Sequence, residues 1–172
     1  MLRGFADTAL FEEISLDAIE ALPVHAGYNH WAELRGARPY PAREELRPQA
    51  IKALLRHFVL IKVIDRARDF HMSIVGDEVQ RAYDVQLNNR LLSDILKNAP
   101  AVMPGWMERY RKVALGGEPL FYRVTAMVDD CEANFIYREV AVLPLGANGI
   151  ITHVATFGHH ELKPPQENAP KR

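Results

Sequence analysis

The residues most able to do chemistry near the end of the chain are three histidines, His153, His159 and His160, together with Glu161. Imidazole and carboxylate groups are common ligands of transition metals. Adjacent side chains on an extended backbone point to opposite faces, however, so His159 and His160 are poorly placed to chelate one ion. The spacing also matches neither C-x-x-C nor H-E-x-x-H. We therefore expect a solvated strand end there and no metal site.

A basic loop over residues 37–47 is the strongest charge feature. Clustered guanidinium groups can bind phosphate or another anion. They can also fix the loop to the rest of the domain by pairing with Glu33, Glu44 and Glu45, and we favour this structural role while keeping the anion site as a candidate. The arginines in and beside the loop are Arg35, Arg38, Arg43 and Arg47.

No catalytic motif is recognisable in the chain. There is no nucleophile elbow, no phosphate-binding loop and no carboxylate pair at a characteristic spacing. The single cysteine, Cys131, lies in an acidic stretch that disfavours a reactive thiolate. We expect no enzymatic activity and assign no catalytic residue, while a small enzyme with a site assembled only in three dimensions stays as an alternative.

The composition of the 172 residues is that of an ordinary soluble globular protein. A net charge of −1 argues against a protein that holds nucleic acid by general electrostatics. One cysteine permits no internal disulfide and suits a reducing compartment. No apolar run approaches the ~20 residues of a membrane span, and the first residues lack the apolar core of a signal peptide. We expect a cytoplasmic protein.

Five stretches have the pattern of β-strands, because they are rich in β-branched and aromatic residues and bounded by turn residues. Two form an expected hairpin, and the other three follow one another through short polar links and form an antiparallel meander. Together they predict one five-stranded antiparallel sheet. The stretches are Phe58–Ile64, Phe70–Val75, Pro119–Val128, Asn134–Pro144 and Ile150–Phe157.

Helical periodicity and capping residues place helices before and between these strands. Residues 1–13 have mixed composition and could be a short helix or an arm, and the Pro-rich segment 163–172 is expected to be disordered. We divide the chain into an N-terminal arm or helix (1–25), one α+β domain (26–162) and a tail (163–172). The expected helices are Ser15–Leu22, Ala26–Leu34, Gln49–Arg56, Glu78–Tyr83, Leu91–Lys97 and Met103–Leu115.

The segment from Trp31 to Arg43 reads W-x-x-L-R-G-x-R-x-x-P-x-R. This segment resembles the entry motif of a family of mostly single-domain bacterial PAS proteins, common in alphaproteobacteria. Leu143-Pro144-Leu145 and the order of the elements fit the same family, and the resemblance covers about residues 28–157. After Tyr83 the chain departs from the family pattern, with Asn89 in place of a glycine. Because Asn tolerates positive φ, the turn can survive there.

The resemblance implies a PAS-like fold and a sensory or protein-interaction module, with any small ligand bound between sheet and helices. Light-sensing PAS domains carry a reactive cysteine in a helix, whereas Cys131 falls in a predicted turn. Haem-binding PAS domains use a histidine in or near the long helix, and residues 77–117 contain none, although His71 or His153 could still reach a cavity. Both flavin–cysteinyl chemistry and haem are therefore disfavoured, and the ligand class stays open.

Six residues are candidates to line a ligand pocket between the sheet and the middle helices. Trp106 and Tyr110 carry polar groups that need partners when buried, which makes them the better candidates. Each of the six could instead be a plain core residue. The candidates are Met72, Trp106, Tyr110, Tyr122, Tyr137 and His153.

The strand Asn134–Pro144 is apolar on both faces, so both must be covered. The middle helices cover one face, and the N-terminal helices, a second subunit or both must cover the other. We predict a homodimer through the outer sheet face and the N-terminal helices. The expected function is a stand-alone PAS sensory or interaction module, without an attached output domain, that regulates an unidentified signalling protein. The alternative is a ligand-free structural dimer or adaptor.

Overall fold

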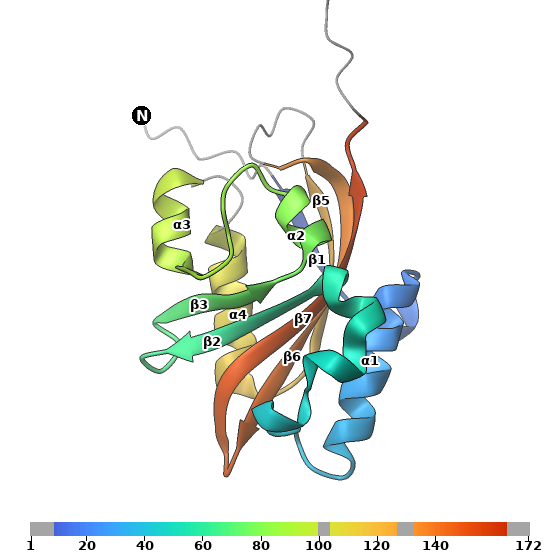
Figure 1. Cartoon of the computed structure of the whole chain (residues 1–172), viewed down its shortest axis with the longest axis vertical. Coiled ribbons are helices and arrows are strands. Elements are labelled where there is room, and N and C mark those ends of the chain that lie inside the picture. The colour runs from blue at the N-terminus through green and yellow to red at the C-terminus, as the bar shows by residue number, and fades with distance from the viewer. Residues whose placement is uncertain (1–8, 100–103, 127–132, 165–172) are drawn as a thin grey trace, which may run out of the picture.

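The structure is a computed structural model, and it describes residues 9–99, 104–126 and 133–164. Its centre is one open antiparallel sheet in the order β1-β5-β6-β7-β2-β3-β4 (Figure 1). The central strands β6 and β7 are the longest, and they pair along almost their whole length. The strands are β1 (Ala9–Ile14), β2 (Phe58–Ile64), β3 (Asp69–Val75), β4 (Arg90–Leu91), β5 (Leu120–Ala126), β6 (Phe135–Ala147) and β7 (Ile150–Leu162).

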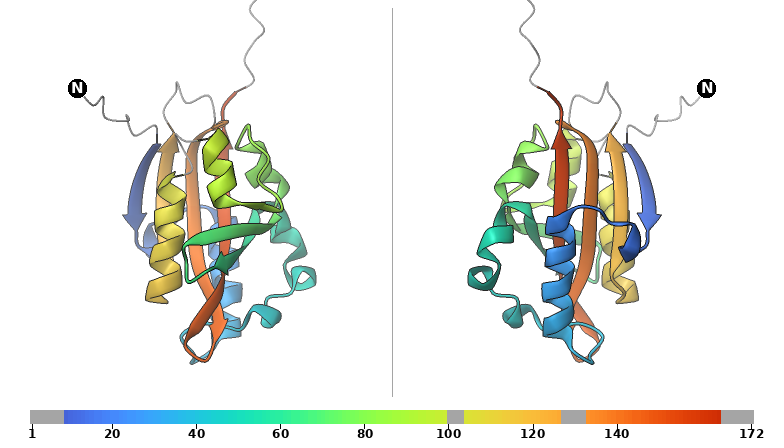
Figure 2. Two further views of the ribbon diagram at one scale, coloured as in Figure 1. Left: turned by 90° about the vertical axis from the view of Figure 1, so that its left-hand side faces the viewer. Right: turned by 90° about the vertical axis from the view of Figure 1, so that its right-hand side faces the viewer.

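Helices cover the sheet on both faces, as the two views of Figure 2 show. We call the two sides the α4 face and the α1 face. On the α4 face lie α2 (Asp77–Arg81), α3 (Leu92–Asn98) and α4 (Pro104–Gly116); on the α1 face lie α1 (Leu22–Arg35) and the 3₁₀ helix η3 (Pro48–His57). Two further 3₁₀ turns are η1 (Leu16–Ala18) and η2 (Arg43–Glu45). No helix of the described ranges is long and apolar enough to cross a membrane.

The coarse expectation of an α+β protein with an antiparallel sheet is confirmed, but the expected number of five strands is wrong. The sheet has seven strands, because β1 and β4 extend it at its two edges. The segment Ala9–Ile14, undecided from the sequence, pairs with β5. A short edge strand is held by backbone hydrogen bonds to one neighbouring strand. Its side chains need not alternate between apolar and polar, so the sequence shows no clear two-residue period there.

The hairpin and meander are confirmed in outline. β2 coincides with the expected Phe58–Ile64, and the turn between β6 and β7 uses Asn148 and Gly149 at positive φ, as its turn residues indicated. Asn89 also adopts positive φ, at 58°. β7 continues to Leu162, five residues beyond its expected end. The link that contains Cys131, and the end of the expected strand Pro119–Val128, lie outside the described residues.

The N-terminal helices differ from the expectation. The expected helix Ala26–Leu34 is confirmed as part of the longer α1, Leu22–Arg35. The helix expected at Ser15–Leu22 is wrong, because only a single 3₁₀ turn forms there, at Leu16–Ala18. The expected helix Ser15–Leu22 ends before Pro23, but Pro23 occupies the first turn of α1, where a missing N–H costs no hydrogen bond. Gly36 ends α1 with φ 57°. The helix expected at Gln49–Arg56 is 3₁₀ and kinked at Ile51.

The prediction that both sheet faces need a cover is confirmed, because β6 is buried without interruption from Arg138 to Gly146. Helix α1 and η3 form a buried cluster with the α1 face, with Trp31 fully buried in it. A second subunit is therefore not needed to cover this part of the sheet. The homodimer stays a prediction, as do the proposed domain limits at residues 25 and 162.

The two sequence motifs that carry the family resemblance meet in space. The indole Nε1 of Trp31 in α1 donates a hydrogen bond of 2.9 Å to the carbonyl oxygen of Pro144 in β6. The pairing of β5 with β6 ends at Leu120 and Val142, two residues before Pro144. The backbone of Pro144 therefore has no partner in β5. The motif tryptophan thus anchors α1 to the central strand.

Gly27 sets how closely α1 approaches the sheet. A Cβ atom at this position would overlap the ring of Phe157 in β7. We expect Gly27→Val to lower the free energy of unfolding by about 1–3 kcal/mol, the usual cost of overpacking a core. Urea denaturation measures the change.

Ala26→Val is the matched control, because Ala26 is exposed on the same helix. The control should change stability by less than about 0.5 kcal/mol, the range of ordinary surface substitutions. Equal stability of the two variants would contradict the close packing of α1 on β7.

Candidate functional site

The most unusual side chain of the structure is Arg138, an arginine in the middle of the sheet. It lies on β6 between β5 and β7, and only 2% of its surface is exposed. Its side chain is on the α4 face, among the apolar residues that pack under α4. An arginine stays charged under all ordinary conditions, so the fold places a permanent charge in its main core.

The guanidinium of Arg138 has only neutral neighbours in the contacts that the structure describes. Its Nη1 donates a hydrogen bond of 3.1 Å to the hydroxyl of Tyr83, which also accepts one of 3.2 Å from Trp106 Nε1. Its Cζ lies 4.4 Å from the centre of a Trp106 ring, which gives a cation–π contact. Nε is buried without a hydrogen-bond partner, and among the described residues Arg138 forms no ion pair.

Further unpaired polar groups lie on β7 on the same face. His160 is directly opposite Arg138, and both of its ring nitrogens are buried without a partner in the described part of the chain. Thr156 Oγ1, four residues back on the same side of β7, also has no hydrogen-bond partner within the described ranges. Between them, Gly158 leaves room for the arginine, since a Cβ there would lie 3.0 Å from Arg138 Nη2. Native cores contain few such groups, so a cluster of them calls for an explanation.

The charge state of the cluster follows from its burial. Burial, reinforced by the charge of Arg138, holds the pKa of His160 well below its ordinary value, so His160 is neutral at neutral pH. Burial also raises the pKa of Tyr110, which stacks on Trp106, so that its hydroxyl stays protonated. The cluster therefore carries one positive charge, that of Arg138. Beside this charge lie the unpaired polar groups of His160 and Thr156.

The next residue along β6 shows the opposite situation. Glu139 is on the α1 face with a side chain 1% exposed, and both of its oxygens have partners. Oε2 accepts the backbone N–H groups of Glu20 and Ala21 at 3.0 and 2.8 Å. Oε1 accepts the Tyr137 hydroxyl at 2.7 Å and pairs with Arg123 Nη2 at 3.3 Å. This buried charge is structural, because it holds the chain segment that leads into α1.

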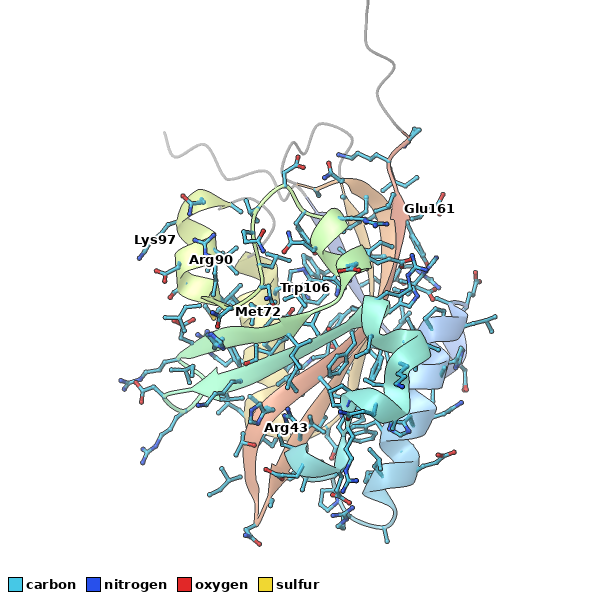
Figure 3. All side chains as sticks on the ribbon, viewed as in Figure 1. Arg43, Met72, Arg90, Lys97, Trp106 and Glu161 are labelled. Atoms are coloured by element: carbon cyan, nitrogen blue, oxygen red, sulfur yellow. The ribbon has the colours of Figure 1, made fainter. Side chains whose placement is uncertain are left out.

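Four of the six pocket candidates come together on the α4 face: Met72, Trp106, Tyr110 and Tyr122 belong to one buried cluster. Met72 and Trp106 also lie near each other in Figure 3. Tyr137 and His153 do not join them. Tyr137 contacts Arg123 and Glu139 on the α1 face, and His153 pairs with Leu145, which is on that face too.

Of the arginine loop candidates, Arg38 pairs with a loop carboxylate, the structural role favoured from the sequence. Arg38 binds Glu45 with two hydrogen bonds of 2.8 and 2.9 Å, Nη2 to Oε1 and Nη1 to Oε2. Arg35 lies over the ring of Trp31 at 5.0 Å. Arg43 lies away from Trp106 in Figure 3, and its charge acts with burial to lower the pKa of His153. The three arginines thus act on different neighbours, Glu45, Trp31 and His153.

Sequence reasoning did not single out Arg138 and Tyr83, and its expectation of a solvated strand end at His160 is wrong, because His160 is only 5% exposed. One signal was available, because Arg138 shares a strand face with Ile136, Val140 and Val142. A charge at such a position is either paired or functional. Tyr83 and His160 carried no comparable signal, because only the tertiary fold brings them to Arg138.

Comparisons with family models, curated proteins and solved structures found no match. The relation to PAS proteins therefore stays a hypothesis based on the sequence motif. The polar groups around Arg138 can donate hydrogen bonds to an anion. A buried guanidinium with a free Nε–H, flanked by hydroxyl, indole and imidazole groups, is suited to bind a carboxylate or a similar oxyanion.

Replacement of Arg138 by methionine tests whether this charge serves stability. A buried charge without a counter-ion costs several kcal/mol of desolvation, so an apolar side chain of similar length should be neutral or stabilising, by up to about 4 kcal/mol. We expect Arg138→Met to keep or raise the free energy of unfolding in urea.

Arg123→Met is the matched control on the neighbouring strand. Arg123 bonds Glu139, Tyr137 and the carbonyl of Ala18 on the α1 face. Its loss should destabilise by about 1–3 kcal/mol, because buried acceptors are left unpaired. A destabilised Arg138→Met variant would show instead that Arg138 is a structural residue.

The carboxylate of Glu139 should make stability depend on acidic pH. Although burial alone would raise its pKa, hydrogen bonds from Tyr137 and from the backbone of Ala21 and Glu20, together with Arg123, lower it below its ordinary value of 4.5. The unfolded chain then binds the proton more readily, so stability is present above pH 4.5 and is lost as pH falls through the folded pKa.

We expect the difference in unfolding free energy between the wild type and Glu139→Gln to be largest at neutral pH and to shrink below pH 4.5. Denaturation at a series of pH values measures it. Glu118→Gln, at an exposed position, controls for the loss of one negative charge. A difference that stays constant with pH would show that Glu139 is not stabilised as the anion.

Proposed function

We propose that the chain is a PAS-like sensory or interaction module of bacterial signalling, non-enzymatic and cytoplasmic, that binds a small anion between the α4 face and its helices. The order of the elements supports this proposal: a hairpin, then helices, then a three-stranded meander. The hairpin joins the meander through pairing of β2 with β7, so the five expected strands are consecutive in the sheet.

One observation carries the anion: the buried guanidinium of Arg138 with an unpaired Nε. A charge taken out of water without an opposite charge is costly, and a fold keeps such a charge when a ligand neutralises it. Charge-assisted hydrogen bonds from arginine to a carboxylate are short and strong. Tyr83, Trp106 and His160 would supply the remaining contacts and thereby shape the selectivity.

A sensor also needs a route from the ligand to a surface. Arg138 and Glu139 are adjacent on β6, and Glu139 holds the backbone of residues 20 and 21 immediately before α1. A shift of β6 on binding would therefore reach the start of α1. There Leu22 is 80% exposed, which offers an apolar contact for a signalling partner or for the proposed homodimer. The partner responds only if it binds the two states with different affinity.

The two tryptophans of the chain provide an internal test by NMR. Trp106 is beside Arg138, whereas Trp31 lies on the other side of the sheet. Acetate, succinate, citrate and inorganic phosphate are titrated into ¹⁵N-labelled protein, and the two indole N–H signals, assigned with Trp106→Phe, are followed. We expect at least one anion to shift the Trp106 signal while the Trp31 signal moves little.

Arg138→Met should abolish the shift or weaken binding at least about tenfold, the loss expected for a charged hydrogen bond. Native mass spectrometry of gently purified protein tests for a ligand that already occupies the site. Unchanged Trp106 signals with every anion, together with a bare protein mass, would favour the ligand-free adaptor. Shifts that persist in Arg138→Met would move the anion site elsewhere.

A further inference from the structure

A second group of polar side chains lies outside the Arg138 cluster and comes from three separate elements. His57 is the last residue of η3, Glu78 is in the first turn of α2, and His159 is on β7. Each offers one ligand atom, and these atoms all lie within 4.8 Å of one another. No two of the three residues are close in sequence.

The contacts within the group leave ligand capacity unused. His57 Nδ1 is 2.8 Å from Glu78 Oε2 and 3.2 Å from the carbonyl oxygen of Gly158. The rings of His57 and His159 are 6.0 Å apart. His159 Nδ1 is buried with no hydrogen-bond partner among the described residues. A buried imidazole nitrogen beside a carboxylate and a second imidazole is the arrangement of a metal-ligand set.

We propose that His57, Glu78 and His159 bind one divalent transition-metal ion, of which Zn²⁺ is the best fit. Two imidazoles and one carboxylate are a common three-ligand zinc set, and the fourth tetrahedral position is left to water or an external ligand. Zn–ligand bonds of about 2.0–2.2 Å place tetrahedral ligands roughly 3.3 Å apart. Binding of one ion therefore requires the ligand atoms to close from 4.8 Å to this spacing.

The surroundings favour the orientations of the side chains that bind metal. His57 Nδ1 and Glu78 Oε2 face each other at 2.8 Å, so these two atoms are already oriented toward one position. A metal ion would replace the proton between His57 Nδ1 and Glu78 and release it to solvent. Arg56 Nη2 holds the other oxygen of Glu78 at 2.9 Å, which orients the carboxylate as outer partners of metal ligands do. Among the described residues, Arg56 is the cationic side chain that pairs with Glu78.

This set differs from the histidine group that the sequence brought to attention. His159 and His160 point to opposite sides of β7, as the alternation of an extended strand requires. His160 is in the Arg138 cluster, and His153 lies farther along β7. Only His159 of that group enters the proposed site. The proposal does not rest on the anion-binding function.

Isothermal titration of ZnCl₂ into the full chain, stripped of metal with EDTA, tests the site. We expect saturable binding of one ion per chain with proton release. Titration with Co²⁺ gives a second readout, because four-coordinate cobalt shows intense visible absorption. His159→Ala and Glu78→Gln should each weaken binding at least about tenfold, since even the outer partners of metal ligands contribute that much.

His71→Ala and His153→Ala are matched controls, because both remove a strand histidine outside the group. They should leave the affinity unchanged, as should Arg138→Met, which separates this site from the anion site. Circular dichroism confirms that each variant is folded. Absence of one-to-one binding, or binding that survives the double variant His57→Gln/His159→Ala, would overturn the proposal.

Discussion

The constraint on which the structure depends is the burial of the central strands on both faces. β6 is buried from Arg138 to Gly146, with β5 and β7 beside it. A strand of this kind needs two covering layers, and one chain of modest size supplies both. The N-terminal segment provides α1 for one face, and the segment between hairpin and meander provides α4 for the other. The contact of Gly27 with Phe157 shows how closely one of these layers is fitted.

Within that constraint, two adjacent charges on β6 have opposite roles. Glu139 is buried and fully bonded, and it fixes the chain before α1. Arg138 is buried and under-bonded, with neutral partners only among the described residues. Stability explains the first charge but not the second, because desolvation of an unpaired guanidinium opposes folding. This difference, rather than the presence of a charge as such, distinguishes the candidate site from the structural network.

Strand alternation separates the polar groups of β7 in the same way. His160 joins Arg138 on the α4 face, while His159 meets His57 and Glu78. Two neighbouring residues thus belong to two different groups, and each group is completed by residues remote in sequence. β6 and β7 therefore carry Arg138, His159 and His160, and the covering segments supply Tyr83, His57 and Glu78 as their partners.

The sequence by itself determined the α+β class, the bounds of β2, the positive-φ turns at Asn89 and Asn148, and the need to cover both faces. These features depend on local composition and on periods of a few residues. The edge strands β1 and β4 and the course of α1 past Pro23 were decided by pairing and packing with distant segments. The candidate site was decided in the same way. Arg138 could be identified as a charge on an apolar face, but Tyr83 and His160 become its neighbours only when strand pairing and helix packing bring separate segments together.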